Sequence, residues 1–193
     1  MNLYLIRHGQ TDQNKQYVVQ GWTNNPLNEN GIEQAHEVGK YLKGENKTFD
    51  FAFTSPLVRA SLTGEIILSY LDNAPELEVD YHFLERDFGV FENLPVPPTI
   101  KMITEEGFSH KGYEDDKLLL KRIENGLINL YKKHPNDNIV IFCHSHVIKS
   151  FLILADPKTY HFQTLLDNGS MHDFTFDGET LKVNEFNITY YKK

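Results

Sequence analysis

Side chains suited to catalysis come directly after apolar segments at four places far apart in the sequence. They are Arg7 with His8, Arg59, Glu85, and His144 with Ser145 and His146. Planar guanidinium groups such as those of Arg7 and Arg59 bind phosphoryl oxygens with two parallel hydrogen bonds each. A neutral imidazole, that of His8 or of His144, is a competent nucleophile, and two nearby cations disfavour its protonation. The set therefore suits transfer of a phosphoryl group.

Departure of an alcohol from phosphorus needs an acid that gives the leaving oxygen a proton. Glu85 is the candidate acid, because burial favours the neutral form of a carboxyl group. The arginines would neutralise the phosphoryl charge, so this chemistry requires no metal ion and no cofactor. His144 and His146 have the donor atoms of a metal pair, but two nearby arginines would repel a divalent cation.

Apolar patterns indicate which elements bring these residues together. Strands are predicted at 2–6, 49–54, 76–80 and 138–143, and helices at 31–44, 55–71, 115–134 and 146–155. This alternation predicts an α/β fold with three layers, α/β/α, and a largely parallel central sheet. Ligands bind beyond the carboxyl ends of the strands in such sheets. The residues that follow the strands are therefore expected in one site.

Local signals set the ends of several elements. Ser55 and Pro56 predict the start of the helix at 55–71, as its N-cap and its first helical residue. The last two β-rich runs, at 171–177 and 180–187, predict a closing antiparallel pair joined by a tight turn.

One segment departs from the alternation of strands and helices. Residues 93–113 hold three prolines and predict an irregular stretch with one helical turn near 100–105. With 193 residues and no change of composition along the chain, we expect one domain over 1–193. The segment 93–113 is then an insertion near the active site, and we expect it to line the end of the site away from the phosphate.

Composition excludes several classes of protein. With 40% hydrophobic and 24% charged residues the chain resembles soluble globular proteins, and no apolar run is long enough to span a bilayer. Charged residues interrupt the N-terminus before a signal peptide develops, and the single cysteine, Cys143, excludes internal disulfides, so we expect a cytoplasmic protein. The net charge of −8 argues against nonspecific binding to nucleic acid or to anionic membranes. A small phosphorylated molecule, held by a local cluster of cations, is the expected partner.

The motifs, in their order and spacing, resemble those of the histidine phosphatase superfamily, the phosphoglycerate mutase-like proteins. LIRHGQTDQN at 5–14 resembles the N-terminal signature of that family. Further blocks are QGWTNNPLNENGIEQA at 20–35, SPLVRASLT at 55–63, LERDFGVFEN at 84–93, VIFCHSHVI at 140–148 and NGS at 168–170. Together the blocks extend over nearly the whole chain.

The resemblance implies roles for individual residues. It implies that His8 is the nucleophile that forms a phosphohistidine, and that Glu85 is the proton donor. The residues it assigns to the phosphoryl group are Arg7, Arg59 and His144, with Asn14 in the phosphate pocket. Candidate contacts to substrate or phosphate are Thr11, Gln20, Gly21 and Ser145.

The chain departs from the usual family pattern at a few positions. Ser145 and His146 stand where the second histidine is usually followed by glycine, and Asn93 replaces the glycine after Glu92. None of these changes removes a catalytic group. Glu92 itself is expected outside the core site, as a surface charge or as a partner of Arg86.

Three alternatives to hydrolysis on histidine remain. Mutases that the chain resembles usually have a longer segment in place of 93–113, which keeps water out, so the short segment here favours a phosphatase over a mutase. A cysteine-based phosphatase would need an arginine six residues after Cys143, where Lys149 stands. A module that binds phosphate without turnover is the third alternative, and the intact catalytic set argues against it.

Overall fold

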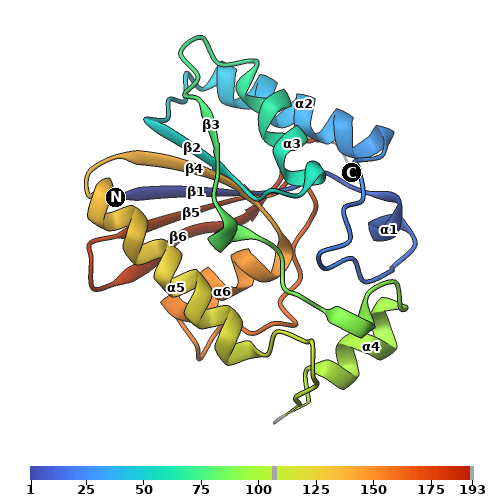
Figure 1. Ribbon diagram of the computed structural model, residues 1–193. Coiled ribbons are helices and arrows are strands. Elements are labelled where there is room, and N and C mark those ends of the chain that lie inside the picture. The colour runs from blue at the N-terminus through green and yellow to red at the C-terminus, as the bar shows by residue number, and fades with distance from the viewer. Residues whose placement is uncertain (106–107, 192–193) are drawn as a thin grey trace.

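The computed structural model of the protein describes residues 1–105 and 108–191, and its centre is one mixed sheet of six strands (Figure 1). The strands are β1 (Asn2–Arg7), β2 (Phe51–Thr54), β3 (Leu77–Val79), β4 (Asn138–Cys143), β5 (Met171–Phe176) and β6 (Leu181–Ile188). Their order in the sheet is β3-β2-β4-β1-β5-β6. β1 to β4 are mutually parallel, and β5 is antiparallel to β1 and to β6, so β5 alone opposes the other strands of this sheet. The prediction of a largely parallel sheet is confirmed.

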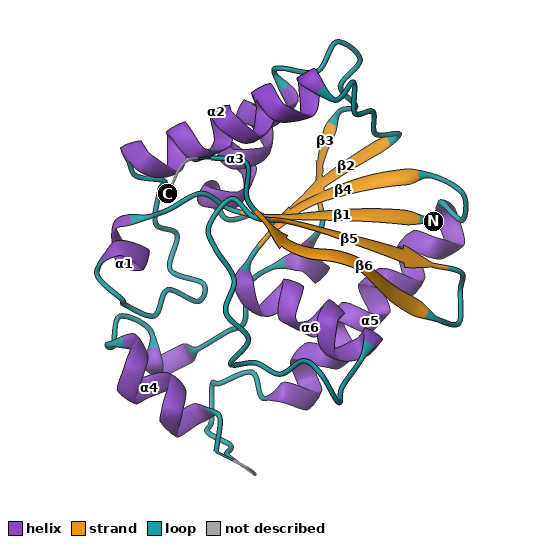
Figure 2. Ribbon diagram, turned by 180° about the vertical axis from the view of Figure 1, so that it is seen from behind, coloured by secondary structure: helices purple, strands orange, loops and turns teal. Residues whose placement is uncertain are grey.

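Helices cover both faces of the sheet, as predicted. They are α1 (Asp12–Lys15), α2 (Glu29–Gly44), α3 (Val58–Leu68), α4 (Val96–Ile103), α5 (Asp116–Lys133) and α6 (Ser145–Ala155), with 3-10 turns η1 (Tyr81–Phe83) and η2 (Gly89–Phe91). Ile139 and Ile141 of β4 pack with side chains of α5 and α6, whereas Val140 and Phe142 pack with those of α2 and α3. A strand buried on both faces requires this continuous apolar sequence. Figure 2 shows the two helix pairs on opposite sides of the sheet, and α1 and α4 beyond the carboxyl ends of β1 and β4.

The predicted start of α3 is wrong by two residues. Leu57 is the N-cap, and the helix begins at Val58 and ends at Leu68. Ser55 does not cap it, because the Ser55 hydroxyl lies 2.7 Å from His144 Nε2 and accepts a bond from the amide of Leu57. The amide of Val58 instead donates to Asn24 Oδ1 at 2.8 Å, so a distant loop completes the helix N-terminus.

The prediction that 93–113 is irregular is wrong for Val96–Ile103, which forms α4. The three prolines lie at the N-cap and in the first turn, where a helix leaves its amide groups unbonded and therefore tolerates proline. Ile103 packs with Val19, Phe88, Phe91 and Tyr113 in a small core separate from the sheet. Residues 106 and 107 of this segment lie outside the described residues.

A close backbone crossing fixes the exit of β1. A Cβ atom on Gly9 would lie 2.3 Å from the carbonyl oxygen of Gly31, and one on Gly31 would lie 2.1 Å from that of Gln10. Both positions therefore require glycine. The crossing holds the residues after β1 against the first turn of α2, where Asn28 caps the helix and donates its amide to the same Gln10 carbonyl.

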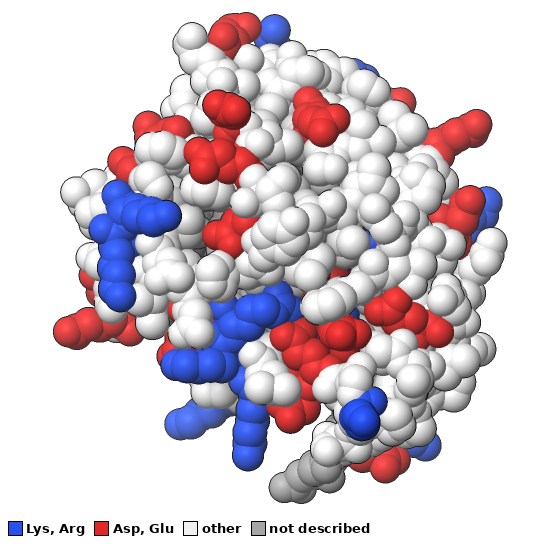
Figure 3. Space-filling model, in the orientation of Figure 1, with Lys and Arg blue, Asp and Glu red and all other residues white. Residues whose placement is uncertain are grey.

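The surface carries charges of both signs. Figure 3 shows acidic and basic side chains interspersed over the face seen in Figure 1. Among residues 1–105 and 108–191, none of the helices has the length and apolar character needed to cross a bilayer. With a net charge of −8, strong attraction for an anion must come from cations gathered in one place.

Candidate active site

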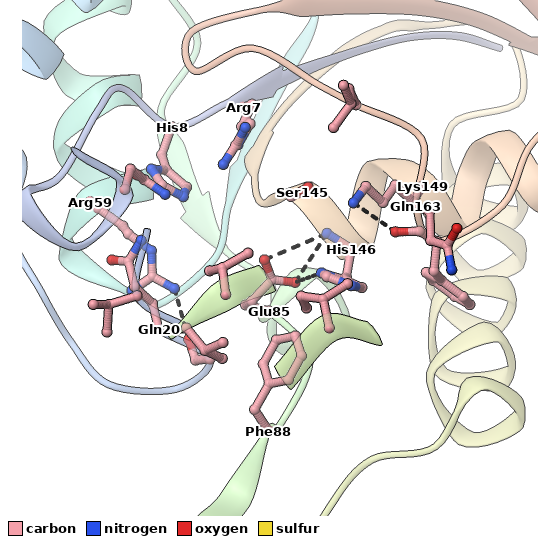
Figure 4. Close-up of a pocket in the computed structure, with 18 residues that line it drawn as sticks. Arg7, His8, Gln20, Arg59, Glu85, Phe88, Ser145, His146, Lys149 and Gln163 are labelled. Atoms are coloured by element: carbon pink, nitrogen blue, oxygen red, sulfur yellow. Dashed lines mark hydrogen bonds and ion pairs between the residues drawn. The ribbon is translucent and has the colours of Figure 1, made fainter. Parts of the chain in front are cut away.

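A cavity of about 250 Å³ lies beyond the carboxyl ends of β1 and β4 (Figure 4). Most of the residues predicted for the site line it, namely Arg7, His8, Asn14, Gln20, Gly21, Arg59, Glu85 and Ser145. Thr11 and His144 are fully buried and are not part of the lining. The sheet thus brings together the groups that follow β1, β2, β3 and β4, although they are far apart in the sequence.

His8 presents an unprotonated ring nitrogen to the cavity. Its Nδ1 lies 2.7 Å from the carbonyl oxygen of Gly9, which can only accept, so we assign the ring proton to Nδ1. Nε2 then carries a free lone pair. Burial, followed by the charges of Arg59 and Arg7, holds the pKa of His8 well below the usual value of histidine. The imidazole is therefore neutral at pH 7 and suited to nucleophilic attack.

Arg59 is held by the backbone of the loop after Gln20. Its Nη2 donates to the carbonyl of Gly21 and its Nη1 to that of Thr23, each at 2.8 Å. Burial lowers the pKa of Arg59 to about 10, so the guanidinium stays charged at neutral pH. Its Nε is buried and has no partner among the described residues.

Arg7 lies at the end of β1 and, like Arg59, has a buried Nε without a hydrogen-bond acceptor among the described residues. Its Nη1 donates to the carbonyl of Leu166, whereas its buried Nε has no partner in the part of the chain that the structure describes. A buried donor without an acceptor is costly, so an acceptor is expected at this place. The oxygens of an anion held between Arg7 and Arg59 would supply acceptors for both Nε groups.

His144 lies behind His8, and the ring centroids are 5.2 Å apart. Its Nε2 is 2.7 Å from the Ser55 hydroxyl, and its Nδ1 is buried without a partner among the described residues. Burial and then the charge of Arg59 hold the pKa of His144 well below the usual value, so this ring is neutral as well.

Thr11 supports the lining from behind. Its hydroxyl lies 3.1 Å from Asn14 Oδ1 and 3.0 Å from Gln20 Oε1, and it also caps α1. Asn168 reaches Asn14 Oδ1 with its Nδ2 at 3.1 Å and the carbonyl of His8 at 3.2 Å. The NGS loop thus ties the exit of β1 to the residues that line the cavity.

Glu92 belongs to the support of the site, so the expectation of a surface charge or of a partner for Arg86 is wrong. Its carboxylate accepts from the amides of Trp22 and Thr23 at 2.7 and 2.9 Å. Gly21, with φ +54°, leaves room for Glu92, because a Cβ there would lie 2.2 Å from its Oε1. Glu92 therefore holds the loop whose carbonyls orient Arg59.

Glu85 lies across the cavity from His8 and Arg59 (Figure 4). Its Oε1 accepts from the amide of Arg86 at 2.9 Å and from that of His146 at 3.2 Å. Its own carbonyl accepts from the Trp22 indole at 2.8 Å. These contacts fix both the backbone and the side chain of Glu85 at one wall of the site.

Further residues line the cavity, some from a segment that was expected there and some that were not predicted. Val96 and Ile100 come from the predicted insertion, as expected for that segment. Phe162 and Gln163 come from the long connection after α6, where no local pattern indicates a site. Lys149 lies one turn into α6 and points into the cavity, and the sequence singled it out only as a mismatch to a cysteine motif.

Cys143 does not line the cavity. Its side chain is fully buried in the core with residues of α5 and α6, and burial raises the pKa of its thiol well above the usual range. A protonated thiol is a poor nucleophile, so the cysteine mechanism has no support here. No cluster of three or more His, Cys, Asp and Glu side chains arranged for a metal ion occurs within residues 1–105 and 108–191.

Comparison with known families agrees with this arrangement. The family model described as the histidine phosphatase superfamily (branch 1) matches residues 3–189. The chain belongs to the histidine phosphatase superfamily. The resemblance inferred from the motifs is thereby confirmed over nearly the whole chain.

Relatives within the histidine phosphatase superfamily include phosphatases and mutases. The uncharacterized phosphatase PhoE of Bacillus subtilis (strain 168) is 35% identical over 187 residues, which cover 95% of this chain and 93% of that protein. A 2,3-bisphosphoglycerate-dependent phosphoglycerate mutase of Treponema denticola is 38% identical over 108 residues, which cover 55% of this chain and 43% of the mutase.

A solved structure from Entamoeba histolytica, a phosphoserine phosphatase in complex with 3-phosphoglyceric acid, superposes with a TM-score of 0.82. It is 30% identical to this chain and covers 97% of each chain. As a member of the histidine phosphatase superfamily with these relatives, the protein is an enzyme with phosphatase or mutase activity.

Proposed function

We propose that the protein is a metal-independent phosphatase that hydrolyses a small phosphomonoester through a phosphohistidine on His8. The observation that carries this proposal is the free lone pair of His8 Nε2 between two arginines with unpaired Nε groups. Nε2 attacks phosphorus, and the bond between phosphorus and the ester oxygen breaks. The departing oxygen takes a proton from Glu85. Water then attacks the phosphohistidine, gives a proton back to Glu85, and releases inorganic phosphate and free His8.

The other groups stabilise the charge that develops on the phosphoryl oxygens. Arg7 and Arg59 are fixed by backbone carbonyls before the substrate arrives, so little reorganisation is needed in the transition state. His144 lies behind His8, and we assign its Nδ1, which has no partner among the described residues, to one further phosphoryl oxygen bound beside His8. We assign substrate contacts to the polar lining side chains of Asn14, Gln20 and Ser145. The Thr11 hydroxyl positions the first two.

Two observations favour hydrolysis over mutase-type transfer. The PhoE phosphatase aligns over 93% of its length, whereas the mutase from Treponema denticola aligns over only 43%. The segment 93–113 is short, and its described residues contribute Val96 and Ile100 to the lining, which favours access of water as the acceptor. The cavity volume of about 250 Å³ suits a small metabolite.

Purified protein is expected to release inorganic phosphate from 3-phosphoglycerate and p-nitrophenyl phosphate in excess EDTA, because arginines neutralise the phosphoryl charge. Vanadate, which mimics five-coordinate phosphorus, should inhibit both reactions. Conversion of 3-phosphoglycerate to 2-phosphoglycerate without phosphate release would identify a mutase. Activity lost in EDTA and restored by zinc or magnesium would contradict metal independence.

Substitution of glutamine for Glu85 tests the role of the acid. An alkoxide needs a proton on leaving and p-nitrophenolate does not, so Glu85→Gln should lower kcat on glycerol phosphate by roughly 10² to 10⁴ and change the aryl ester far less. The ratio of the two kcat values is the measurement, because a folding defect lowers both together. An equal loss on both esters would show that Glu85 is not the acid, and His146 would be the next candidate.

A further inference from the structure

A second buried cation lies in the cavity, away from His8 and Arg59. The side chain of Lys149 is 9% exposed and lines the cavity wall formed by α6. Its ammonium donates one hydrogen bond, to the carbonyl of Phe162 at 2.8 Å. Within the described part of the chain, no Asp or Glu oxygen lies within ion-pair distance of its Nζ. Lysine is rarely buried without a partner, and the described residues supply an acceptor for only one of the three donors of this ammonium.

A second polar group at this end also lacks a partner. His146 is 6% exposed and its Nε2 makes no hydrogen bond to the described residues. The ring is stacked on Phe162 at 5.6 Å and meets the edge of Phe88 at 5.1 Å, so its position is fixed. Burial and the charge of Lys149 hold the pKa of His146 well below the usual value. A neutral imidazole can give or accept one hydrogen bond, according to its tautomer.

The cavity lining carries more positive charge than one phosphoryl group can offset. Arg7, Arg59 and Lys149 are opposed by one carboxyl group, that of Glu85. A phosphomonoester dianion offsets the two arginines, and the Glu85 carboxyl group bonds to the amides of Arg86 and His146 and not to Lys149. Lys149 then remains without an opposing charge in contact. It lies between apolar walls, where the attraction between its ammonium and an anion would be strong. Burial lowers the pKa of Lys149 to about 8, as expected for an ammonium without an anionic neighbour in contact.

We propose that Lys149 binds a carboxylate at the far end of the substrate and thereby selects phosphomonoesters of small carboxylic acids. Figure 4 places Lys149 and Gln163 on the opposite side from His8 and Arg59, with Ser145 and His146 between them. One ammonium matches the single charge of a carboxylate, whereas a second phosphoryl group would call for a guanidinium fork or several donors. The cavity of about 250 Å³ leaves room for a short spacer only. This assignment rests on the proposed phosphatase function of the same cavity.

Two substrates that differ at one group test the assignment. 3-Phosphoglycerate and glycerol 1-phosphate share a three-carbon skeleton, and a carboxylate in the first is a hydroxymethyl group in the second. We expect kcat/KM to favour 3-phosphoglycerate by roughly 10- to 100-fold, the effect of one hydrogen bond to a charged group. Lys149→Met should abolish this preference, so that the ratio of the two kcat/KM values falls to near one.

The control is Lys101→Met, which makes the same change of net charge at an exposed residue of α4 that does not line the cavity. It should keep the preference. Equal kcat/KM for the two esters in the unsubstituted protein, or an equal loss on both in Lys149→Met, would overturn the assignment of Lys149.

Binding to the His8→Ala variant separates this assignment from the proposed function. Calorimetric titration with the two esters measures the carboxylate preference where turnover is blocked, and adding Lys149→Met should remove it. A preference in binding without hydrolysis by the unsubstituted protein would support Lys149 and contradict the phosphatase. Hydrolysis without a preference in either assay would contradict Lys149 alone.

Discussion

Replacement of His8 by alanine is expected to lower kcat on every phosphomonoester by roughly 10⁴ to 10⁶, the loss seen when a covalent nucleophile is removed. The reason is that, among residues 1–105 and 108–191, no other unprotonated nucleophile lies at the same place. His144 lies behind His8 with its Nε2 bonded to Ser55, outside the cavity lining. The arginines remain in the variant, so phosphate and vanadate should still bind. Steady-state kinetics on p-nitrophenyl phosphate and glycerol phosphate measure the effect.

Cys143→Ala is the matched control for that substitution. Cys143 directly precedes His144, but its side chain lies in the core against α5 and α6, and burial holds its thiol protonated. Its kcat should stay within a few-fold of the unsubstituted protein. If Cys143→Ala were inactive and His8→Ala active, the mechanism proposed for His8 would be wrong.

Replacement of Arg59 by alanine is expected to lower kcat/KM by roughly 10³ or more, and by the same factor for aryl and alkyl esters. Every phosphoryl group needs its equatorial oxygens bound, whatever alcohol leaves. Arg59→Lys should recover little activity, because the single nitrogen of an ammonium cannot occupy the separate positions from which the guanidinium nitrogens reach the carbonyls of Gly21 and Thr23 and a phosphoryl oxygen.

The melting temperature of each Arg59 variant separates catalysis from folding, since the substitution also leaves two backbone carbonyls without their donors. Glu92→Gln offers a milder comparison, because it weakens the same loop without touching the guanidinium. A loss confined to alkyl esters, or full recovery in Arg59→Lys, would show that Arg59 does not bind the phosphoryl group.

The sequence predicted that Arg7, His8, Glu85 and His144 would lie close together, because each follows a strand, and the structure brings them together. Strand ends in a parallel sheet lie at one edge, so the positions of Arg7, His8, Glu85 and His144 could be inferred from apolar periodicity alone. The choice of His8 over His144 as the nucleophile came from the resemblance to a family, since spacing left the two histidines equivalent. The hydrogen bond from His8 Nδ1 to the Gly9 carbonyl distinguishes them, and it is visible only in the structure.

Other features depended on contacts between distant segments. The hydroxyl of Ser55 suits a helix cap, but it bonds instead to His144, the residue that follows β4. Prolines normally interrupt helices, and in α4 they fall where the first turn tolerates them. Glu92 and Lys149 are of residue types that usually lie on the surface. Only the structure shows that Glu92 bonds to the loop that holds Arg59 and that Lys149 lines the cavity.

The covalent intermediate is the central claim, and rapid quench with mass spectrometry tests it most directly. Protein mixed with a phosphomonoester and quenched in alkali should carry one phosphoryl group, on the peptide that contains His8. This label should be stable in alkali and lost in acid, as expected for a phosphoramidate, and it should be absent from His8→Ala. A label that resists acid, a label on the peptide of Cys143, or turnover in His8→Ala would contradict the account.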